Sequence, residues 1–228
     1  MLALLTSCWL GFLIGLRHAL DPDHLAAVST LVADHPKSWR AAFLGTCWGL
    51  GHSAALLVAG GVLLAWRAQL PARWAEVFEL GVSLMLIALG IRSLRRSLQA
   101  RGSSAPHEHR GVVHVHQGEQ DHFHLFSWTI ARRPFLIGVA HGLAGTGGIT
   151  ALALASMPSA GAALLYIALF ALGSIGGMAL LTGIAGVPME RIARRPASRA
   201  ALLACVGAAS LLVGIGWGAP IAGRLLSF

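Results

Sequence analysis

The stretch Arg17-His18-Ala19-Leu20-Asp21-Pro22-Asp23-His24 places five ionisable side chains and a proline inside an apolar segment that extends from Leu2 to Ala33. Each Asp or Arg at the centre of a bilayer costs roughly 2.5 to 3.5 kcal/mol, so charges at that depth indicate a functional site. Two imidazoles beside two carboxylates point to a cation. Imidazole ligands favour a transition metal over Na⁺ or Mg²⁺.

Composition places the chain among membrane proteins that cross the bilayer several times. Of the 228 residues, 56% are hydrophobic and only 11% are charged. A chain of this length has room for about six helices of about 20 residues each, and its 28 glycines allow helices to approach closely. The net charge of +8 comes from basic residues between the apolar segments. We therefore expect a lipid bilayer as the surroundings and no nucleic-acid partner.

The pattern predicts an all-α polytopic membrane protein whose first helix is broken near Pro22, because proline cannot donate a hydrogen bond to the carbonyl of His18. The six expected helices cover about 2–33, 40–66, 74–95, 134–156, 160–187 and 199–223. We divide the chain into a first three-helix repeat (1–95), a His-rich loop (96–127) and a second three-helix repeat (128–228).

The two halves share short motifs in a preserved order. Phe12-Leu13-Ile14-Gly15 and His18 recur as Phe135-Leu136-Ile137-Gly138 and His141, 123 residues later. Further matches join Leu50-Gly51 to Leu172-Gly173 at a separation of 122, and Gly81 and Gly90 to Gly207 and Gly216 at a separation of 126. Three helices per repeat is an odd number, so the copies are expected to insert with opposite topology. Inverted repeats place the substrate site near the midplane, where His18 and His141 correspond.

The basic residues of the connecting segments give an orientation. Thirteen of them fall on one side of the expected membrane, and three, Arg67, Arg73 and Arg224, fall on the other. By the excess of Lys and Arg in cytoplasmic loops, both termini are expected outside and the His-rich loop in the cytoplasm. The first apolar segment has no small-residue cleavage site and is expected to be retained.

The candidate metal ligands are His18, Asp21, Asp23, His24, His52 and His141. Helical spacing places Asp21 on the same face as His18 and His24, whereas a break at Pro22 swings Asp23 towards His24. Gly49 and Gly51 favour a close helix contact that brings His52 to the first helix. Each candidate also has a purely structural alternative. Asp21 and Asp23 could cap a second helix after a helix-breaking turn, and His52 could bond to a neighbouring backbone carbonyl. His141 could be buried in a helix contact lined by glycines.

Six of the eleven histidines lie in the loop, as three His-x-His pairs. In an extended chain, residues i and i+2 share one side, so each pair offers two imidazoles to one ion. The loop is expected to buffer or hand over metal, the alternative being a polar linker. The pairs are His107/His109, His114/His116 and His122/His124.

His18-x4-Asp23-His24 resembles the H-x4-D-H signature of the nickel/cobalt transporter family, and Gly51-His52-Ser53 resembles that family's motif in the following helix. The resemblance implies that His18, Asp23 and His24 are needed to transport Ni²⁺ or Co²⁺, with His52 beside them, and it favours Asp23 over Asp21. Family members commonly have eight spans and an acidic motif in the second half, where this chain has His141 and glycines. In these two respects the chain resembles the short permeases associated with urease and other nickel enzymes.

The function expected from these features is a secondary permease for a divalent transition metal, Ni²⁺ first and Co²⁺ second, in the cytoplasmic (inner) membrane. It is expected to be no enzyme and to need no cofactor besides the transported ion, since no nucleotide-binding motif appears. The resemblance also implies cytoplasmic partners such as nickel chaperones or urease and hydrogenase accessory proteins. Three alternatives stay open: a nickel/cobalt efflux transporter, a membrane subunit that assists nickel-enzyme maturation, and a membrane enzyme or redox conduit that uses bound metal or haem.

Overall fold

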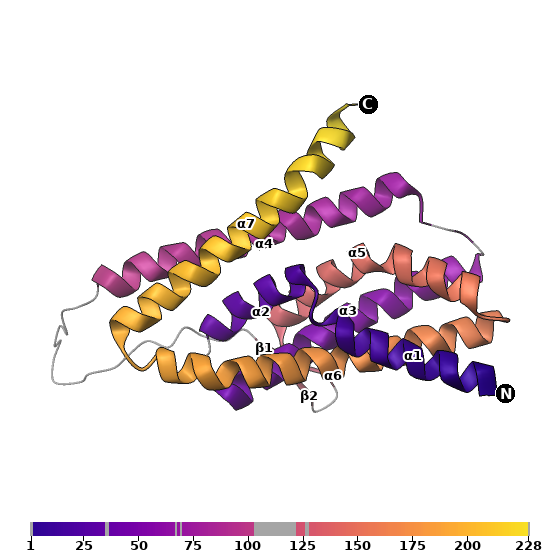
Figure 1. Cartoon of the computed structure of the whole chain (residues 1–228), viewed down its shortest axis with the longest axis horizontal. Helices are drawn as coiled ribbons and strands as arrows, with labels where there is room; N and C mark the ends of the chain where they lie inside the picture. The colour runs from indigo at the N-terminus through magenta and orange to yellow at the C-terminus, as the bar shows by residue number, and fades with distance from the viewer. Residues whose placement is uncertain are drawn as a thin grey trace.

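The structure is a computed structural model, and it describes residues 2–34, 37–66, 68, 70–102, 122–125 and 128–227. These residues form seven helices and a small two-stranded ribbon (Figure 1). The helices are α1 (Leu2–His18), α2 (Pro22–Asp34), α3 (Ser38–Ala65), α4 (Ala72–Gly102), α5 (Arg132–Ser156), α6 (Ala160–Ile192) and α7 (Pro196–Leu226). The strands β1 (His122–Leu125) and β2 (Trp128–Ala131) pair antiparallel.

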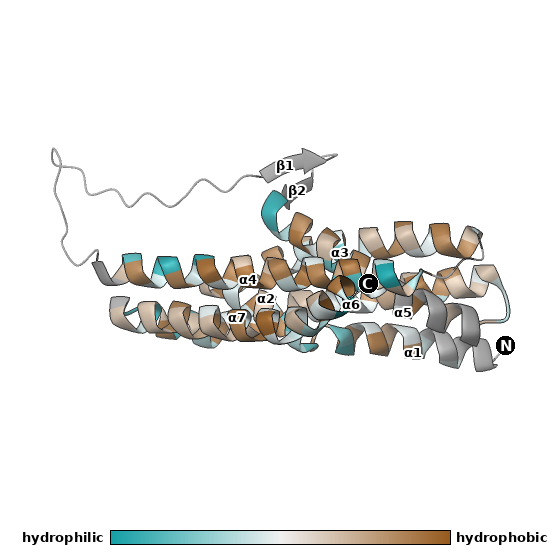
Figure 2. Ribbon diagram, turned by 90° about the horizontal axis from the view of Figure 1, so that it is seen from above, coloured by the Kyte–Doolittle hydropathy of each residue, from teal (hydrophilic) through white to brown (hydrophobic). Residues whose placement is uncertain are grey.

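Four of the helices, α3, α4, α6 and α7, are long and apolar enough to cross a membrane. Figure 2 shows the apolar character along the helices, with hydrophilic residues gathered towards the C-terminal end of α4 and at the start of α5. Helices α1 and α2 have 17 and 13 residues, fewer than the roughly 20 of a typical spanning helix. The all-helical character agrees with the sequence prediction apart from the ribbon.

The first apolar segment is broken where the sequence predicted. The amide of Leu20 donates to the carbonyl of Arg17 at 2.8 Å, and the amide of Asp21 donates to the carbonyl of His18 at 3.1 Å. This tight turn ends α1. It also provides a donor for the carbonyl of His18, to which Pro22 cannot donate a hydrogen bond. Pro22 is the first residue of α2, a position where a missing N–H costs nothing. The break therefore follows directly from the local sequence.

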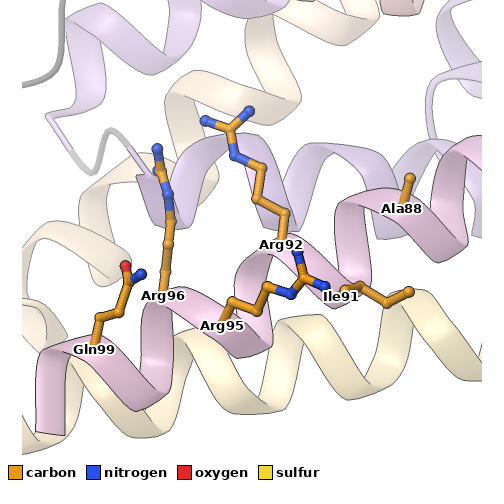
Figure 3. A pocket seen from close by; sticks show the side chains of 6 residues that line it. All are labelled: Ala88, Ile91, Arg92, Arg95, Arg96 and Gln99. Carbon is orange, nitrogen blue, oxygen red and sulfur yellow. The ribbon is translucent and has the colours of Figure 1, made fainter. Parts of the chain in front are cut away.

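Two further boundaries differ from the sequence prediction. The first residues of the expected loop 96–127 are helical, because α4 continues past Arg92 and Arg95 through Arg96 to Gly102 (Figure 3). Arginine favours helix, and the Ser97 hydroxyl binds the carbonyl of Ala200 in α7 at 2.7 Å, which holds this end of α4 in place. The same predicted loop contains β1 near its end.

Helix α6 continues through Pro188 to Ile192 instead of ending at 187. Proline interrupts only one backbone hydrogen bond, and membrane helices tolerate it where neighbouring helices support the chain. The carbonyl of Gly183 in this region accepts a hydrogen bond of 2.8 Å from the hydroxyl of Ser38 in α3. The helix therefore passes its proline without ending.

Helices α1 and α6 meet backbone to backbone at two glycines. A Cβ atom at Gly15 in α1 would meet the backbone carbonyl of Phe170 in α6. Reciprocally, a Cβ atom at Gly173 in α6 would meet the carbonyl of Phe12 in α1. The lack of side chains at these two positions lets the two helices touch.

Helices α3 and α5 meet in the same way. A Cβ atom at Gly138 in α5 would meet the carbonyl of Trp48 in α3, and one at Gly51 in α3 would meet the carbonyl of Phe135 in α5. Helix α3 also packs along α6, so α1, α6, α3 and α5 form a continuous set of neighbours. These four helices and the break between α1 and α2 surround the candidate site.

Helices α4 and α7 form a separate antiparallel pair that lies along α2 and α5 (Figure 1). Buried serines join the pair: Ser93 donates to the carbonyl of Leu203 and Ser210 donates to the carbonyl of Leu86, each at 2.8 Å. A hydroxyl bonded across a helix contact satisfies a polar group that lipid could not. The pair covers the outer side of α2, which carries part of the site.

Candidate metal centre

The break after α1 brings two histidines of the opening motif together. His18 is the last residue of α1 and His24 lies in the first turn of α2, and their ring centroids are 4.5 Å apart. His24 is almost completely buried, whereas the side chain of His18 is 19% exposed. The two rings therefore contact each other across the break.

His18 is held by the nearer aspartate. Its Nδ1 atom donates to Oδ2 of Asp21 at 2.7 Å. The carboxylate can only accept, so the lone pair of the neutral His18 ring lies on Nε2. Asp21 itself is half exposed and is absent from the groups of donors that lie close enough to hold an ion. Asp21 therefore fixes the orientation of His18, as carboxylates do for metal-binding imidazoles.

The other aspartate joins two parts of the chain that are 118 residues apart. Asp23 accepts from Nδ1 of His24 at 3.1 Å through Oδ1 and from Nε2 of His141 at 2.9 Å through Oδ2. All three side chains are buried. The free lone pairs of these neutral rings lie on Nε2 of His24 and Nδ1 of His141. Both atoms are buried and have no hydrogen-bond partner among the described residues.

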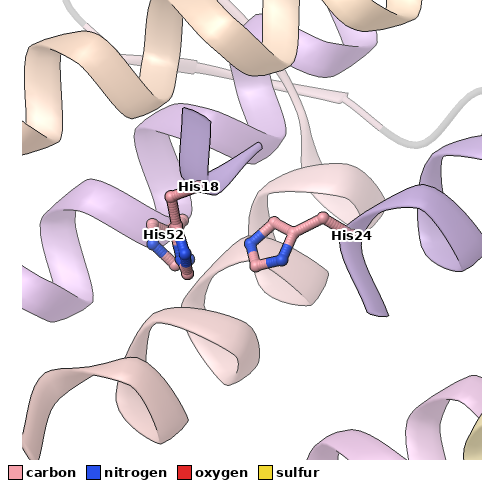
Figure 4. A group of neighbouring side chains, drawn as sticks. All are labelled: His18, His24 and His52. Atoms are coloured by element: carbon pink, nitrogen blue, oxygen red, sulfur yellow. The ribbon is translucent and has the colours of Figure 1, made fainter. Parts of the chain in front are cut away.

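His52 enters from the middle of α3. Its ring lies 5.3 Å from that of His18 and 5.4 Å from that of His24, measured between centroids. Figure 4 shows the three rings converging on one another. His52 is buried, and its Nδ1 atom also lacks a partner among the described residues. Buried polar atoms are ordinarily paired, so three unpaired nitrogens in one place need an explanation.

Two groups of donors in the described part of the chain are compact enough to hold a metal ion. His18, His24 and His52 form the first, and Asp23, His24 and His141 form the second, with the donor atoms of each group within 4.8 Å of one another. We call them the imidazole group and the carboxylate group. They share His24. His18 and His52 belong only to the imidazole group, and Asp23 and His141 belong only to the carboxylate group.

Aromatic side chains that sequence reasoning did not single out enclose the donors. Trp48 of α3 lies 5.3 Å from the ring of His24 and 5.7 Å from that of His141, and Phe170 of α6 lies 5.3 Å from that of His18. Both are fully buried. The signal that could have found them is their separation of 122 residues, the same as that between Gly51 and Gly173.

The described part of the chain includes one pair of the His-rich segment, in β1. His122 and His124 lie in β1, opposite Ala131 and Thr129 of β2. The pairs His107/His109 and His114/His116 lie outside the described residues.

The fold and the site together define a class: a multi-pass membrane protein that encloses, among its apolar helices, a set of buried donors typical of sites for transition-metal ions. Comparison with known proteins narrows this class. The chain belongs to the NicO family of high-affinity nickel-transport proteins, whose family model matches residues 4–204. It is therefore a nickel transporter by family.

Curated relatives share long stretches with the chain. It is 32% identical over 214 residues to the urease accessory protein UreH of Bacillus sp. (strain TB-90), which covers 93% of this chain and 90% of the relative. It is 30% and 28% identical to the chloroplast proteins FOR GROWTH AND FERTILITY 2 and 1 of Arabidopsis thaliana, over 82% of this chain and about half of each plant protein (49% and 52%). No solved structure matches.

Proposed function

We propose that this protein is a permease that carries Ni²⁺, and less readily Co²⁺, across the cytoplasmic membrane into the cell. The observation that carries the proposal is the buried cluster of histidines at the break between α1 and α2. There His24, His52 and His141 each have a ring nitrogen with no partner among the described residues. Imidazole nitrogen suits the borderline-soft late transition metals, and a buried carboxylate offsets the charge of the ion. The family supplies the preference for nickel.

The ligands that we propose for the ion come from His18, Asp23, His24, His52 and His141. Asp21 supports this set from outside, because its carboxylate holds His18 and is itself half exposed. We therefore assign the direct role to Asp23. The three-dimensional arrangement supports this choice because Asp23, unlike Asp21, contacts a histidine of the second half of the chain.

The reciprocal helix contacts support an inverted repeat of three helices. The contact of Gly15 with Phe170 corresponds to that of Gly138 with Trp48, after residue numbers shift by 123 in α1 and by 122 in α3. Two halves related by a two-fold axis would make such contacts in pairs. In this arrangement α1 and α2 together correspond to α5, and the metal cluster lies beside the axis.

The hydrogen bonds from serine hydroxyls between α4 and α7 also come in a reciprocal pair, as a two-fold axis would produce. Corresponding residues in this pair are 117 positions apart. Ser93 and Ser210 are 117 apart, and so are their acceptors Leu86 and Leu203. Gly90 and Gly207, which meet each other, share that separation. The value differs from the 126 suggested by the sequence, which pairs Gly81 with Gly207 and Gly90 with Gly216. The reciprocal contacts support a separation of 117 instead.

Counting α1 and α2 as one interrupted span and α5 as another gives six spans. The basic end of α4, with Arg92, Arg95 and Arg96 (Figure 3), then lies on the cytoplasmic side together with the start of α5. Both termini lie outside, as the distribution of basic residues favours. The ion would leave the cluster towards the His-rich segment.

The experiment that tests this function is accumulation of ⁶³Ni by cells that produce the wild type or His24→Ala at equal level in the membrane. We expect the wild type to raise cellular nickel. Cells with His24→Ala should accumulate no more nickel than cells without the protein, since His24 belongs to both donor groups. Equal accumulation in both strains would refute the proposal. Lower nickel in wild-type cells than in empty cells would instead establish efflux.

A second candidate function has one observation in its favour, the similarity to a relative named as a urease accessory protein. In that case the protein would assist nickel-enzyme maturation rather than carry nickel itself. Accumulation of ⁶³Ni in a host without urease or other nickel enzymes separates the two functions. A transporter raises cellular nickel in such a host, whereas a maturation subunit does not.

A further inference from the structure

The imidazole group and the carboxylate group have one residue in common, His24. We propose that they are two alternative positions for the transported ion, occupied one at a time, and that the ion passes from one to the other by changing the nitrogen of His24 that it binds. This inference rests on the proposed transport function but makes a separate statement about binding.

Geometry separates the two positions. In the carboxylate group, Asp23 lies 3.1 Å from Nδ1 of His24 and 2.9 Å from Nε2 of His141. Two ligands that are about 2.0 to 2.1 Å from one ion are about 3.3 Å apart at the tetrahedral angle, so this group has nearly the spacing that an ion requires. In the imidazole group, the rings of His18 and His52 lie on the same side of the His24 ring (Figure 4).

The unpaired nitrogens show how one ring can serve both positions. Nδ1 of His24 now donates to Asp23, which leaves the lone pair on Nε2 for an ion in the imidazole group. An ion in the carboxylate group takes the place of the two protons between Asp23 and the rings of His24 and His141. Those protons move to Nε2 of His24 and Nδ1 of His141, the two atoms that have no partner among the described residues.

The same chemistry excludes simultaneous occupancy. A neutral imidazole has one lone pair, so His24 can bind an ion through Nδ1 or through Nε2 but not through both. Two divalent ions on either side of one ring would also repel each other four times as strongly as two unit charges at that distance. The protein is therefore expected to bind one ion in total.

Exposure and charge give the two positions an order. The imidazole group includes His18, whose side chain is 19% exposed, while the side chains of the carboxylate group are at most 10% exposed. The imidazole group is electrically neutral and the carboxylate group carries one negative charge. The ion therefore meets the imidazole group first and moves to the enclosed carboxylate group, where its charge is offset.

The test uses the purified full-length protein in lipid nanodiscs and NiCl2 as the probe. Calorimetry gives the number of bound ions, and X-ray absorption at the nickel edge gives their ligands. His52→Gln weakens only the imidazole group and His141→Gln only the carboxylate group, while His24→Gln affects both. Ser97→Ala, which changes a buried polar contact between α4 and α7, is the matched control.

We expect one ion per wild-type protein and one per molecule of His52→Gln and of His141→Gln, with affinities within about 10-fold of the wild type. His24→Gln should bind Ni²⁺ about 100-fold more weakly than the wild type, at the upper end of the range for changes at a metal site. Nickel bound to His141→Gln should show more imidazole scattering than nickel bound to His52→Gln. Ser97→Ala should bind Ni²⁺ with the same stoichiometry and affinity as the wild type. Every variant must elute from size-exclusion chromatography at the position of the folded wild type.

Two results would overturn the inference. Binding of two ions per wild-type protein would show that the positions are not exclusive. Loss of binding in His52→Gln or His141→Gln as complete as in His24→Gln would show one composite site. Absence of nickel transport by reconstituted wild type would refute the proposed function, but the binding data would still decide between one position and two.

Discussion

At the scale of the residue, the two aspartates of the opening motif have different surroundings although they are two positions apart. Asp21 is half exposed and contacts His18, its neighbour one helical turn earlier. Asp23 is buried and bridges His24 to His141. A buried charge is tolerated only when it is paired, so Asp23 depends on the histidines as much as they depend on it. The difference predicts unequal effects of removing each charge.

Asp23→Asn should reduce the affinity for Ni²⁺ by about 100-fold, because Asp23 completes the carboxylate group and also holds His24, the residue that both groups share. Asp21→Asn changes only the support of His18 and should reduce the affinity by about 10-fold. The concentration dependence of ⁶³Ni uptake by proteoliposomes measures both. Glu190→Gln, the same change of chemistry near the end of α6, is the control and should leave uptake unchanged. A larger effect for Asp21→Asn would reverse our assignment of the two aspartates.

At the scale of the element, glycines determine which helices touch. Gly173 and Gly176 lie three residues apart in α6, yet only the first faces another helix closely. A Cβ atom at Gly173 would meet the carbonyl of Phe12, while one at Gly176 would have nothing within 4 Å. The α1–α6 contact places the end of α1, and hence His18, against the rest of the bundle.

Gly173→Ala should therefore destabilise the protein by about 1 to 3 kcal/mol, the usual cost of overpacking, while Gly176→Ala should leave the stability unchanged or slightly raised. Gly51→Ala should behave like Gly173→Ala, because its Cβ atom would meet the carbonyl of Phe135 in α5. Thermal unfolding in detergent, followed by tryptophan fluorescence, gives the comparison. Equal stability of Gly173→Ala and Gly176→Ala would contradict this account of the α1–α6 contact.

At the scale of the whole molecule, the proposed orientation makes a prediction about the two sides of the membrane. Starting from a variant without the native cysteines Cys8, Cys47 and Cys205, single cysteines are introduced at Gly102 and Ser227. A membrane-impermeant maleimide added to intact cells should label Ser227→Cys and should label Gly102→Cys only after the cells are opened. The opposite pattern would invert the orientation. Labelling of both in intact cells would rule out six spans.

Local features of the sequence were sufficient for several predictions. Pro22 predicted the end of α1 because it has no amide hydrogen for the carbonyl of His18, and the apolar segments predicted long helices because bilayer thickness fixes their length. The ends of α4 and α6 were predicted less well. Arg95, Arg96 and Pro188 read as helix boundaries in isolation, but contacts with α7 and α3 hold the chain helical beyond them.

By itself, the sequence determined the class of the protein and the break near Pro22, and it supplied the imidazoles and carboxylates that are candidate ligands. Hydropathy, the chemistry of proline and the presence of imidazoles depend only on the residues and their near neighbours. Only the tertiary structure decided that Asp23 contacts His141, that Asp21 is directed to His18 alone, and that Trp48 and Phe170 enclose the rings. Those relations join residues far apart in the chain, and the packing of four helices fixes them rather than any local spacing.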